Sequence, residues 1–485
     1  MKLKELLINL NYELIQGSDN IEIKNIGWDS RRVKPNSLFI CVKNKNIDRH
    51  DYAASAVLNG ATALVIEHDI EKISENITII KVPDSKKAMA KIASLYYGEP
   101  SKKFNLIGIT GTNGKTSVTY FVSKILENAG RLTGIIGTIQ NTVGGKELKA
   151  AKLNPTTPDS IELQESFNEI FSGGASDVVM EVTSSALDKG RVYECHFNIG
   201  VFTNLTQDHL EEHGTMENYK NAKLKLFKMC KKALINADDI VSKEIREIAS
   251  GKVYTYGIEE PSDFKAFDII YGLDSVEFSL KFMNEVKRVK FNIPGKFSVY
   301  NALSAIGICY LSGLNLDTII DGLKDIKGVP GRVEKIPNDK GILAVVDYAH
   351  SPDSLENIIN SMREIAKGKV ITVFGCGGNR DKTKRPIMGE IAGRLSDYVV
   401  ITSDNPRKED PITIINEIEQ GILKTNCHYE KCENRKEAIF KALEKADIGD
   451  VVIIAGKGHE TYQIIGDTTI HFDDREVVRE YFDKI

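Results

Sequence analysis

The 485-residue chain is predicted to be an α/β protein of three domains. The first observation is its length, which is too great for one hydrophobic core and suits about three domains of roughly 150 residues each. The second is a series of short β-branched runs, and the third is that helical segments separate most of them. Apolar strands between amphipathic helices are typical of parallel sheets covered on both faces. The predicted strands are Leu38–Val42, Ala63–Glu67, Ile77–Val82, Leu106–Thr110, Asp177–Val182, Ile199–Asn204, Leu343–Asp347, Val370–Phe374, Tyr398–Ser403 and Val451–Ala455.

Two breaks divide this series. Ser101–Lys103 precedes the fourth strand, and glycine and proline cluster at Gly328–Arg332 before a new set of strands begins. Between about Val253 and Ile293 the pattern is weaker and alternates, which predicts a small antiparallel addition. The expected domains are residues 1–101, 102–330 and 331–485.

Composition excludes several classes of protein. Lysine and arginine total 64 against 68 acidic residues, so no net basic field attracts nucleic acid, although local binding stays open. The seven cysteines include no C-x-x-C pair, which favours a reducing compartment over a structural zinc site. Met1–Glu5 begins a short amphipathic helix, not a signal peptide, and no apolar run is long enough to cross a membrane. We expect a cytoplasmic monomer without membrane insertion or a nucleic-acid partner.

A glycine-rich stretch after the strand Asn105–Ile109 predicts a phosphate loop. Glycines let backbone N–H groups approach phosphate oxygens, and the next helix directs its positive end toward them. Lys115 can reach the β- and γ-phosphates, and Thr116 can offer a hydroxyl group to Mg²⁺. Ile109 stands where the common pattern has glycine, so the loop is a shorter variant; the alternative is an ordinary glycine turn. The predicted ATP-binding residues are Gly111, Thr112, Asn113, Gly114, Lys115, Thr116 and Ser117.

Polar side chains follow two further strands. Glu181 ends one strand, and Asp208 and His209 come shortly after another. Ligands of open α/β sheets bind at the carboxyl ends of the strands, and carboxylate oxygens suit Mg²⁺. Each carboxylate alone is more often a helix cap or a loop residue. Their joint position around a phosphate loop favours a metal site, with Asp208 and His209 binding or orienting a second ion.

These segments together resemble the Mur ligase family. The resemblance spans nearly the whole chain and is carried by GTNGKTS at Gly111, MEVTSSAL at Met180, NLTQDHLEEHGTMENYKNAK at Asn204, PGKFSVYNALSA at Pro294, GRVE at Gly331, DYAHSPDSLE at Asp347 and GCGGNRDKTKRP at Gly375. It implies a small N-terminal α/β uridine-nucleotide domain, a central phosphate-loop domain and a C-terminal Rossmann-like domain. The N-terminal match includes Trp28–Arg32 and His50–Tyr52.

The match is closest to the members that add the third residue of the peptide stem. It therefore implies an ATP-dependent ligase that adds meso-2,6-diaminopimelate to UDP-N-acetylmuramoyl-L-alanyl-D-glutamate for peptidoglycan synthesis, with ATP and Mg²⁺. ATP would phosphorylate the substrate carboxylate, and the amine would attack the acyl phosphate. Positioning and charge neutralisation would be the protein's main tasks.

The resemblance also implies a metal set and a modified lysine. Thr116 and Glu181 would hold one Mg²⁺ and His209 the second, and Lys223 matches a lysine that is carbamylated in the family. Carbon dioxide reacts only with a neutral amine, so this role requires a buried lysine with a lowered pKa. The alternative is that Lys223 is one of several solvated lysines on its helix.

Other contacts carry over one by one. Adenine and ribose contacts would come from Asn301, Arg332, Asp347 and His350. The UDP-muramoyl dipeptide would be held by Ser30, Thr156, Thr157, Ser184, Lys189 and Arg191. Three positions depart from the family pattern, because Ser185, Lys189 and Arg49 stand where histidine, glutamine and glycine are familiar.

Arg407 predicts the amino-acid substrate. It lies in Asp404-Asn405-Pro406-Arg407, which resembles the motif of ligases that add diaminopimelate. Diaminopimelate differs from lysine by a second carboxylate, which a guanidinium group can bind through two hydrogen bonds. The alternative is a proline turn with a surface arginine. The predicted pocket is Arg380, Asp404, Asn405, Pro406, Arg407, Gly456 and Glu460.

Two other classes of protein are alternatives to this function. One comprises a lysine-adding ligase, a folylpolyglutamate synthetase or an amidotransferase partner subunit, and the other a phosphate-loop switch or transport NTPase. The uridine-like N-terminal domain and the third domain with its own amino-acid pocket disfavour most of these. ATP contacts on two domains also predict that the domains close during catalysis.

Overall fold

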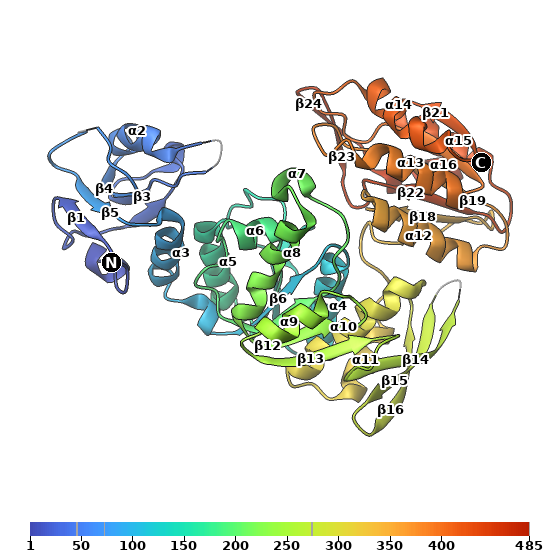
Figure 1. Cartoon of the computed structure of the whole chain (residues 1–485), viewed down its shortest axis with the longest axis horizontal. Helices are drawn as coiled ribbons and strands as arrows, with labels where there is room; N and C mark the ends of the chain where they lie inside the picture. Colours follow the sequence, from blue (N-terminus) through green and yellow to red (C-terminus); the bar gives the residue numbers. More distant parts are fainter. Residues whose placement is uncertain (45–46, 72, 273–274, 485) are drawn as a thin grey trace.

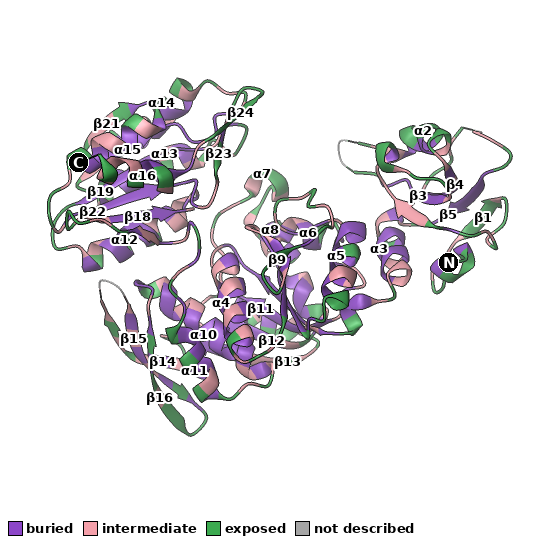
Figure 2. Ribbon diagram, turned by 180° about the vertical axis from the view of Figure 1, so that it is seen from behind, coloured by how far each residue is buried: buried purple, intermediate pink, exposed green. Residues whose placement is uncertain are grey.

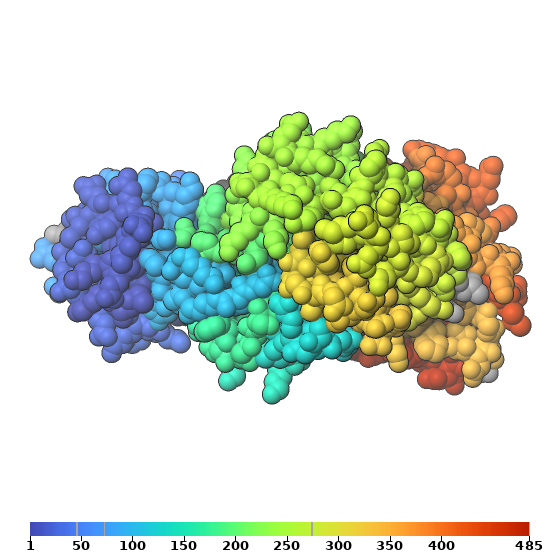
Figure 3. Space-filling view, turned by 90° about the horizontal axis from the view of Figure 1, so that it is seen from below, coloured from blue at the N-terminus to red at the C-terminus, as the bar shows by residue number. Residues whose placement is uncertain are grey.

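The computed structural model describes residues 1–44, 47–71, 73–272 and 275–484, and these residues form three large sheets in a row and one two-stranded sheet (Figure 1). The N-terminal sheet lies at one end and the C-terminal sheet at the other, with the largest sheet between them. The space-filling view shows the same order, with the blue and the orange-red parts on opposite sides of the green and yellow central part (Figure 3). The predicted three-domain α/β architecture is confirmed.

The N-terminal sheet is mostly parallel. Its strand order is β1-β5-β4-β3-β2, and only β1 runs antiparallel to its neighbour. The strands are β1 (Glu13–Gln16), β2 (Asn25–Gly27), β3 (Ser37–Ile40), β4 (Ala61–Ile66) and β5 (Thr78–Lys81). The helices are α1 (Leu3–Leu6), α2 (Ala53–Leu58) and α3 (Ser85–Tyr96), with 3-10 turns η1 (Ser30–Arg32), η2 (Arg49–Tyr52) and η3 (Pro100–Lys102).

The central sheet has the order β16-β15-β14-β13-β12-β11-β6-β10-β7-β8-β9 among the described residues. Its strands are β6 (Asn105–Thr110), β7 (Thr133–Ile136), β8 (Asn141–Val143), β9 (Lys146–Glu147), β10 (Asp177–Glu181), β11 (Phe197–Phe202), β12 (Cys230–Asn236), β13 (Lys252–Gly257), β14 (Phe264–Tyr271), β15 (Val276–Phe282) and β16 (Glu285–Phe291). Its helices are α4 (Lys115–Asn128), α5 (Ser160–Ser172), α6 (Ser184–Asp188), α7 (Leu210–His213), α8 (Met216–Leu224), α9 (Ser242–Ile248), α10 (Lys296–Leu311) and α11 (Leu316–Lys324), with η4 (Lys225–Lys228).

The middle of this sheet is parallel and buried on both faces. β6 lies between β10 and β11, and all three run in the same direction. Helices α4, α10 and α11 belong to one apolar cluster, whereas α5 packs into a second. Figure 2 shows the consequence, since the central strands are purple and the outer faces of the helices are pink or green. The carboxyl ends of β6, β10 and β11 therefore meet at one edge of the sheet.

The antiparallel addition is smaller than the sequence predicted. β15 runs antiparallel to both of its neighbours, β14 and β16, but β13 pairs in parallel with β12 and continues the main sheet. The prediction of an antiparallel strand at Val253 was therefore wrong; residues 273 and 274, within the same predicted segment, lie outside the described ranges. The first half of β13 is only partly buried, and a half-buried strand alternates in sequence whichever way its neighbour runs.

The C-terminal sheet has the order β17-β18-β22-β19-β20-β21, and all its pairs are parallel except β17 with β18. The strands are β17 (Glu334–Ile336), β18 (Leu343–Asp347), β19 (Val370–Phe374), β20 (Tyr398–Thr402), β21 (His428–Cys432) and β22 (Val451–Ala455). The helices are α12 (Pro352–Ile365), α13 (Lys384–Leu395), α14 (Pro411–Ile422), α15 (Arg435–Glu444) and α16 (Asp474–Asp483), and β23 (Tyr462–Ile465) with β24 (Thr468–His471) forms a separate hairpin.

Among the described residues, no helix is both long and apolar enough to cross a membrane.

Candidate active site

The phosphate loop joins β6 to α4, and two of its glycines are sterically required. Gly111 has φ of 149°, and a Cβ there would lie 1.8 Å from Oγ1 of Thr203. Gly114 has φ of 87°, and a Cβ there would lie 2.6 Å from Oδ1 of Asn301. Residues with a side chain rarely adopt such φ values. The loop therefore places bare backbone against the end of β11 and the start of α10, where α4 begins.

Two lysines converge on this loop. Nζ of Lys115 donates to the carbonyl oxygens of Gly111 (2.9 Å) and Thr112 (2.8 Å), and burial lowers its pKa. Nζ of Lys223, from α8, donates to the same Gly111 oxygen at 2.8 Å. Only 2% of Lys223 is exposed, so it is not one of the solvated helix lysines. Burial, and then the charge of Lys115, lower the pKa of Lys223 well below its usual value.

Glu181 meets the phosphate loop as predicted. Its Oε2 accepts from Oγ1 of Thr116 (2.9 Å) and from Oγ1 of Thr138 (3.0 Å), while Oε1 accepts from the backbone N–H of Thr138 (2.7 Å). Thr116 and Glu181 border a cavity of about 190 Å³. A carboxylate beside a hydroxyl group is a donor set that suits Mg²⁺. The sequence analysis did not predict Thr138 as a site residue, because it lies in an irregular loop after β7.

Asp208 and His209 differ in their surroundings. Burial opposes ionisation of Asp208, but the charges of His209, His350 and Lys384 lower its pKa. The His209 ring is 48% exposed and lies 3.5 Å from Oδ2 of Asp208 and 3.8 Å from Oε1 of Glu211. The described contacts therefore place His209 with these carboxylates and do not join it to Glu181.

A cavity of about 690 Å³ opens beside the phosphate loop, between the central and C-terminal sheets. It is lined by Asn113, Gly114 and Ser117 of the loop region and by Asn301, Arg332 and Asp347, so it brings together three of the four predicted adenine and ribose contacts. The sequence did not single out Asp238 and Tyr300, which also line it and are joined by a 2.8 Å hydrogen bond.

Contacts across this cavity tie the two parts of the molecule together. Nδ2 of Asn113 donates to Oδ2 of Asp353 at 2.5 Å, and Nη2 of Arg332 lies 3.4 Å from Oγ1 of Thr116. Arg332 also stacks over the ring of Tyr348 at 4.4 Å. The start of α12 and the segment before β17 therefore contact the phosphate loop directly.

His350, the fourth predicted contact, is outside the set that lines this cavity. Its Nδ1 lies 2.8 Å from the carbonyl oxygen of Tyr348, and Nζ of Lys384 donates to the carbonyl oxygen of His350. Burial, followed by the charge of Lys384, lowers the pKa of His350 to about 4. Because Nδ1 of the neutral imidazole donates to a carbonyl oxygen, its Nε2 can only accept a hydrogen bond.

The residues predicted to bind the muramoyl dipeptide form a group beside Glu181. Thr156 and Thr138 join their hydroxyl groups at 3.0 Å, and Thr157 donates to the Glu181 carbonyl oxygen at 2.9 Å. Arg191 donates to the Thr157 carbonyl oxygen at 3.1 Å.

Two more residues of this set, Ser184 and Lys189, lie on α6 and just after it. Ser184 bonds the ring of His213 at 3.0 Å, whereas Lys189 is exposed and pairs with Glu212. Lys152 was not predicted as a site residue, but its Nζ donates to the Gly137 and Thr138 carbonyl oxygens at 2.8 Å each.

Ser30 lies apart from this group, in the N-terminal domain. It is buried in η1, and its carbonyl oxygen accepts from Asn59. The ring of Trp28 stacks under the guanidinium group of Arg49 at 4.2 Å, and Trp28 donates to Oε1 of Glu162 on α5 at 2.9 Å. The Trp28–Arg32 segment is thus tied to the central domain.

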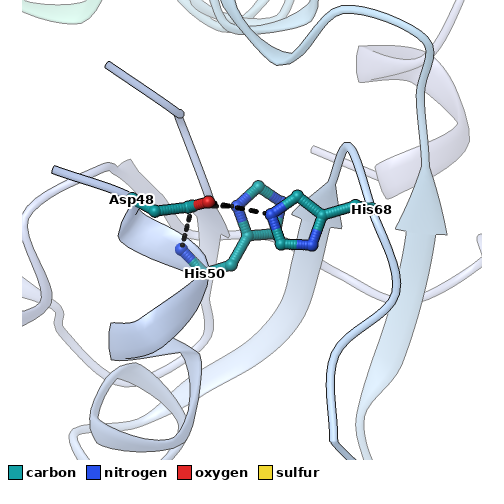
Figure 4. Close-up of side chains that lie close together, drawn as sticks. All are labelled: Asp48, His50 and His68. Carbon is teal, nitrogen blue, oxygen red and sulfur yellow. Dashed lines mark hydrogen bonds and ion pairs between the residues drawn. The ribbon is translucent and has the colours of Figure 1, made fainter. Parts of the chain in front are cut away.

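The same domain carries a cluster of Asp48, His50 and His68 (Figure 4). Asp48 bonds Nδ1 of His50 at 2.6 Å and Nε2 of His68 at 2.9 Å, and the two rings stack at 3.8 Å. Nε2 of His50 accepts from the backbone N–H of Glu67, and Nδ1 of His68 faces the Asp69 carbonyl oxygen. Both nitrogens of His68 face acceptors, which favours the ring with two N–H groups, and in that form neither ring offers a lone pair to a metal.

The predicted amino-acid pocket lies at the carboxyl end of β20. Arg407 has φ of 53° and donates to the carbonyl oxygens of Gly378 (3.0 Å) and Asn405 (3.4 Å). Asp404, Asn405 and Pro406 are buried beneath it, while Arg380 is exposed on the facing loop.

Glu460 and Gly456 complete this pocket from the segment after β22. Oε2 of Glu460 accepts from Nδ2 of Asn405 at 2.8 Å, and a Cβ on Gly456 would lie 2.5 Å from Oδ2 of Asp404. The sequence did not single out Lys457, which is fully buried between Asn405 and Glu460.

Three models of Mur ligase domains and a curated relative match this chain. Residues 22–97 match the Mur ligase family catalytic domain, residues 109–309 the Mur ligase middle domain, and residues 331–458 the Mur ligase glutamate ligase domain. The UDP-N-acetylmuramoyl-L-alanyl-D-glutamate–2,6-diaminopimelate ligase 2 of Clostridium acetobutylicum is 49% identical over 480 residues, covering 99% of each chain.

Two solved structures extend the comparison. The structure of a UDP-N-acetylmuramoyl-L-alanyl-D-glutamate–2,6-diaminopimelate ligase has a TM-score of 0.72 at 30% identity and covers 100% of this chain and 99% of its own. The MurF ligase of Thermotoga maritima in complex with ADP has a TM-score of 0.65 at 22% identity, covering 95% and 97%, and shows the shared fold.

Proposed function

Because the chain belongs to the Mur ligase family, we propose that it is a MurE-type ligase that joins meso-2,6-diaminopimelate to UDP-N-acetylmuramoyl-L-alanyl-D-glutamate at the expense of ATP. The observation that carries the proposal is the convergence of Lys115, Lys223 and Glu181 on one phosphate loop, next to the threonines of the dipeptide site. The domain roles follow the predicted boundaries, with the uridine nucleotide on residues 1–101, ATP on 102–330 and the amino acid on 331–485.

The residues at the phosphate loop handle phosphoryl transfer. ATP would occupy the 690 Å³ cavity that Asn301, Arg332 and Asp347 line, with these residues on its nucleoside. Lys115 of the adjoining loop would contact its phosphates. Mg²⁺, held by Thr116 and Glu181, would neutralise phosphate charge. The remaining loop residues supply backbone N–H groups; this set is Gly111, Thr112, Asn113, Gly114 and Ser117.

Lys223 fits the carbamate role because it is buried and its pKa is lowered. The ammonium group first loses a proton, and the neutral amine then adds carbon dioxide, which forms an N–C bond and releases a second proton, so a repelling cation becomes a carboxylate. His209 is proposed to face the second ion after a change of its loop, because its ring is exposed and adjoins Asp208.

The dipeptide and the amine meet between the central and C-terminal parts. Thr156, Thr157, Ser184, Lys189 and Arg191 would hold the muramoyl dipeptide, with Ser30 near the uridine. Arg380, Asp404, Asn405, Pro406, Arg407, Gly456 and Glu460 would hold diaminopimelate, so that its amine reaches the acyl phosphate. We propose a monomer, and the seven free cysteines support a cytoplasmic enzyme.

The deciding experiment measures phosphate release and product mass with ATP, Mg²⁺ and the UDP-muramoyl dipeptide, adding one amino acid at a time. The proposal expects amide formation with meso-diaminopimelate and little with L-lysine or without an amino acid. Hydrolysis of ATP independent of both substrates would instead indicate a phosphate-loop switch. Preferential use of lysine would support the lysine-adding alternative.

A further inference from the structure

The amide group of Asn405 is fixed in one orientation at the centre of the amino-acid pocket. Its Oδ1 accepts from the backbone N–H of Ile464 (2.9 Å) and lies 3.3 Å from Nζ of Lys457. Its Nδ2 donates to Oε2 of Glu460 at 2.8 Å. Because Oδ1 faces two donors, the flipped amide would place an N–H group against an N–H group and an ammonium group.

Lys457 also contacts the carboxylate directly. Its Nζ lies 3.2 Å from Oε2 of Glu460, the same oxygen that accepts from Asn405. Two donors therefore occupy Oε2, and the hydroxyl group of Tyr462 is a further hydrogen-bond partner of this carboxylate. Lys457 is 0% exposed, so solvent does not screen its charge.

The charge of Lys457 opposes two effects that favour the neutral form of Glu460. Burial and the charge of Asp404 raise the pKa of Glu460, whereas Lys457 and the hydrogen bond from Asn405 lower it. The charged or titratable groups that face Glu460 are Asp404, Lys457, Tyr348, Arg435 and Tyr462. Arg435 is committed to Asp474, to which it is bound at 2.8 Å through two nitrogens.

We propose that Lys457 is a positioning residue of the amino-acid pocket, which holds the Asn405 amide in place and keeps the Glu460 carboxylate ionised so that it can bind an ammonium group of the incoming amino acid. This inference rests on the proposed function, since it assumes that Glu460 receives the amino acid. An ionised carboxylate binds an ammonium group through a charge-assisted hydrogen bond, which a neutral carboxyl group forms much more weakly. Lys457 would therefore act on substrate binding through its two neighbours, without touching the reacting atoms.

The test compares the parent enzyme with Lys457→Gln, which keeps a donor but removes the charge. The KM for diaminopimelate should rise about tenfold or more, while the KM for ATP stays within about twofold, because only amino-acid binding uses Glu460. The acidic limb of kcat/KM for diaminopimelate should move to higher pH. Deprotonation of the substrate amine contributes equally to both enzymes, so the shift between them reports Glu460. Lys424→Gln, at an exposed lysine paired with Glu390, is the matched control.

A double-mutant cycle separates this role from simple support of the fold. If Lys457 acts through Glu460, adding Lys457→Gln to Glu460→Gln should raise the KM little beyond the value for Glu460→Gln alone. Additive losses, or an unmoved acidic limb in Lys457→Gln, would overturn the proposal. If Lys457→Gln does not fold, Lys457→Arg decides: it keeps the cation and should retain the parent's acidic limb, and a shifted limb would overturn the inference. A parent enzyme that forms no amide would instead refute the proposed function.

Discussion

The side-chain nitrogen of Lys223 lies 2.8 Å from the carbonyl oxygen of Gly111, so a lysine from α8 is bound to the first residue of the phosphate loop. The ammonium group lies 4.3 Å from the ring centroid of Tyr219 and has no described ion pair with a carboxylate. Lys115 adds a second positive charge beside it. The neutral amine is favoured at this position, which is the form that reacts with carbon dioxide.

We therefore predict that Lys223 is carbamylated at neutral pH. Protein equilibrated with ¹³C-bicarbonate should give a carbamate carbon signal that Lys223→Arg lacks. Lys223→Ala should reduce kcat by about 100-fold or more, because a group that stabilises developing charge is lost, and short carboxylic acids should restore part of the rate. A ¹³C spectrum identical in parent and Lys223→Arg would contradict the assignment.

Gly111→Ala should impair ATP binding more than it impairs folding of the other domains. The new Cβ would lie 1.8 Å from Oγ1 of Thr203, in a backbone conformation that alanine rarely adopts. The phosphate loop must therefore shift, and the affinity for an ATP analogue in calorimetry should fall by at least about tenfold. Gly130→Ala is the matched control, since Gly130 also has positive φ but no atom within 4 Å of the added Cβ. Equal losses in both variants would show that backbone conformation alone, and not the contact with Thr203, matters.

The sequence predicted those parts of the site that depend on local order. The phosphate loop directly follows one buried strand and Glu181 is the last residue of another, so strand, loop and helix order was enough to place them together. Thr138 and Lys152 come from irregular segments whose approach to Glu181 depends on the pairing of β7 and β10 and on a loop without periodicity. No pattern in the chain marks such contacts.

Lys457 illustrates a second limit. It stands within Gly456–Glu460, a segment recognised for its glutamate, yet its complete burial results from the hairpin of β23 and β24 folding over Asn405. In the same way, the family motif pointed to Lys223, but the loss of solvent that gives it a low pKa depends on tertiary packing. Burial of a single charge is a property of the fold, and composition near the residue does not encode it.

The pair of Asp48 and His68 should give a pH-dependent contribution to stability. The hydrogen bond that His68 donates to Asp48 raises the pKa of His68. Burial favours the neutral form of Asp48, but the hydrogen bonds that it accepts from His68 and His50 outweigh burial and lower its pKa. The His68 contribution is complete below its unfolded pKa of about 6.5 and is lost as pH rises through its folded pKa. The Asp48 contribution is present above its unfolded pKa of about 3.9 and is lost as pH falls through its lower folded value.

Removing the imidazole should therefore matter only under mildly acidic conditions. Thermal unfolding of His68→Gln should fall below that of the parent at about pH 5.5 and approach it at about pH 8.5. His428→Gln, at an exposed histidine on β21 far along the chain, serves as the control. A destabilisation of His68→Gln that is equal at both pH values would mean that the ring contributes through stacking on His50, and not through its charge.

Arg407 should decide between diaminopimelate and lysine. Its guanidinium group is held above Gly378 and Asn405 by hydrogen bonds to their carbonyl oxygens, which fixes its position but leaves its positive charge without a carboxylate partner among the described contacts. The second carboxylate of diaminopimelate can provide that partner, whereas the side-chain ammonium group of lysine would be repelled.

Arg407→Ala keeps the same Cβ at φ of 53°, so backbone strain is unchanged. We expect kcat/KM for diaminopimelate to fall by about 100-fold, the value of a lost charge-assisted pair, while the slight use of lysine stays the same or rises. Lys408→Ala, at the exposed neighbouring residue, should leave both substrates unaffected. Equal losses for the two amino acids in Arg407→Ala would mean that the arginine supports the loop, and that specificity lies elsewhere in the pocket.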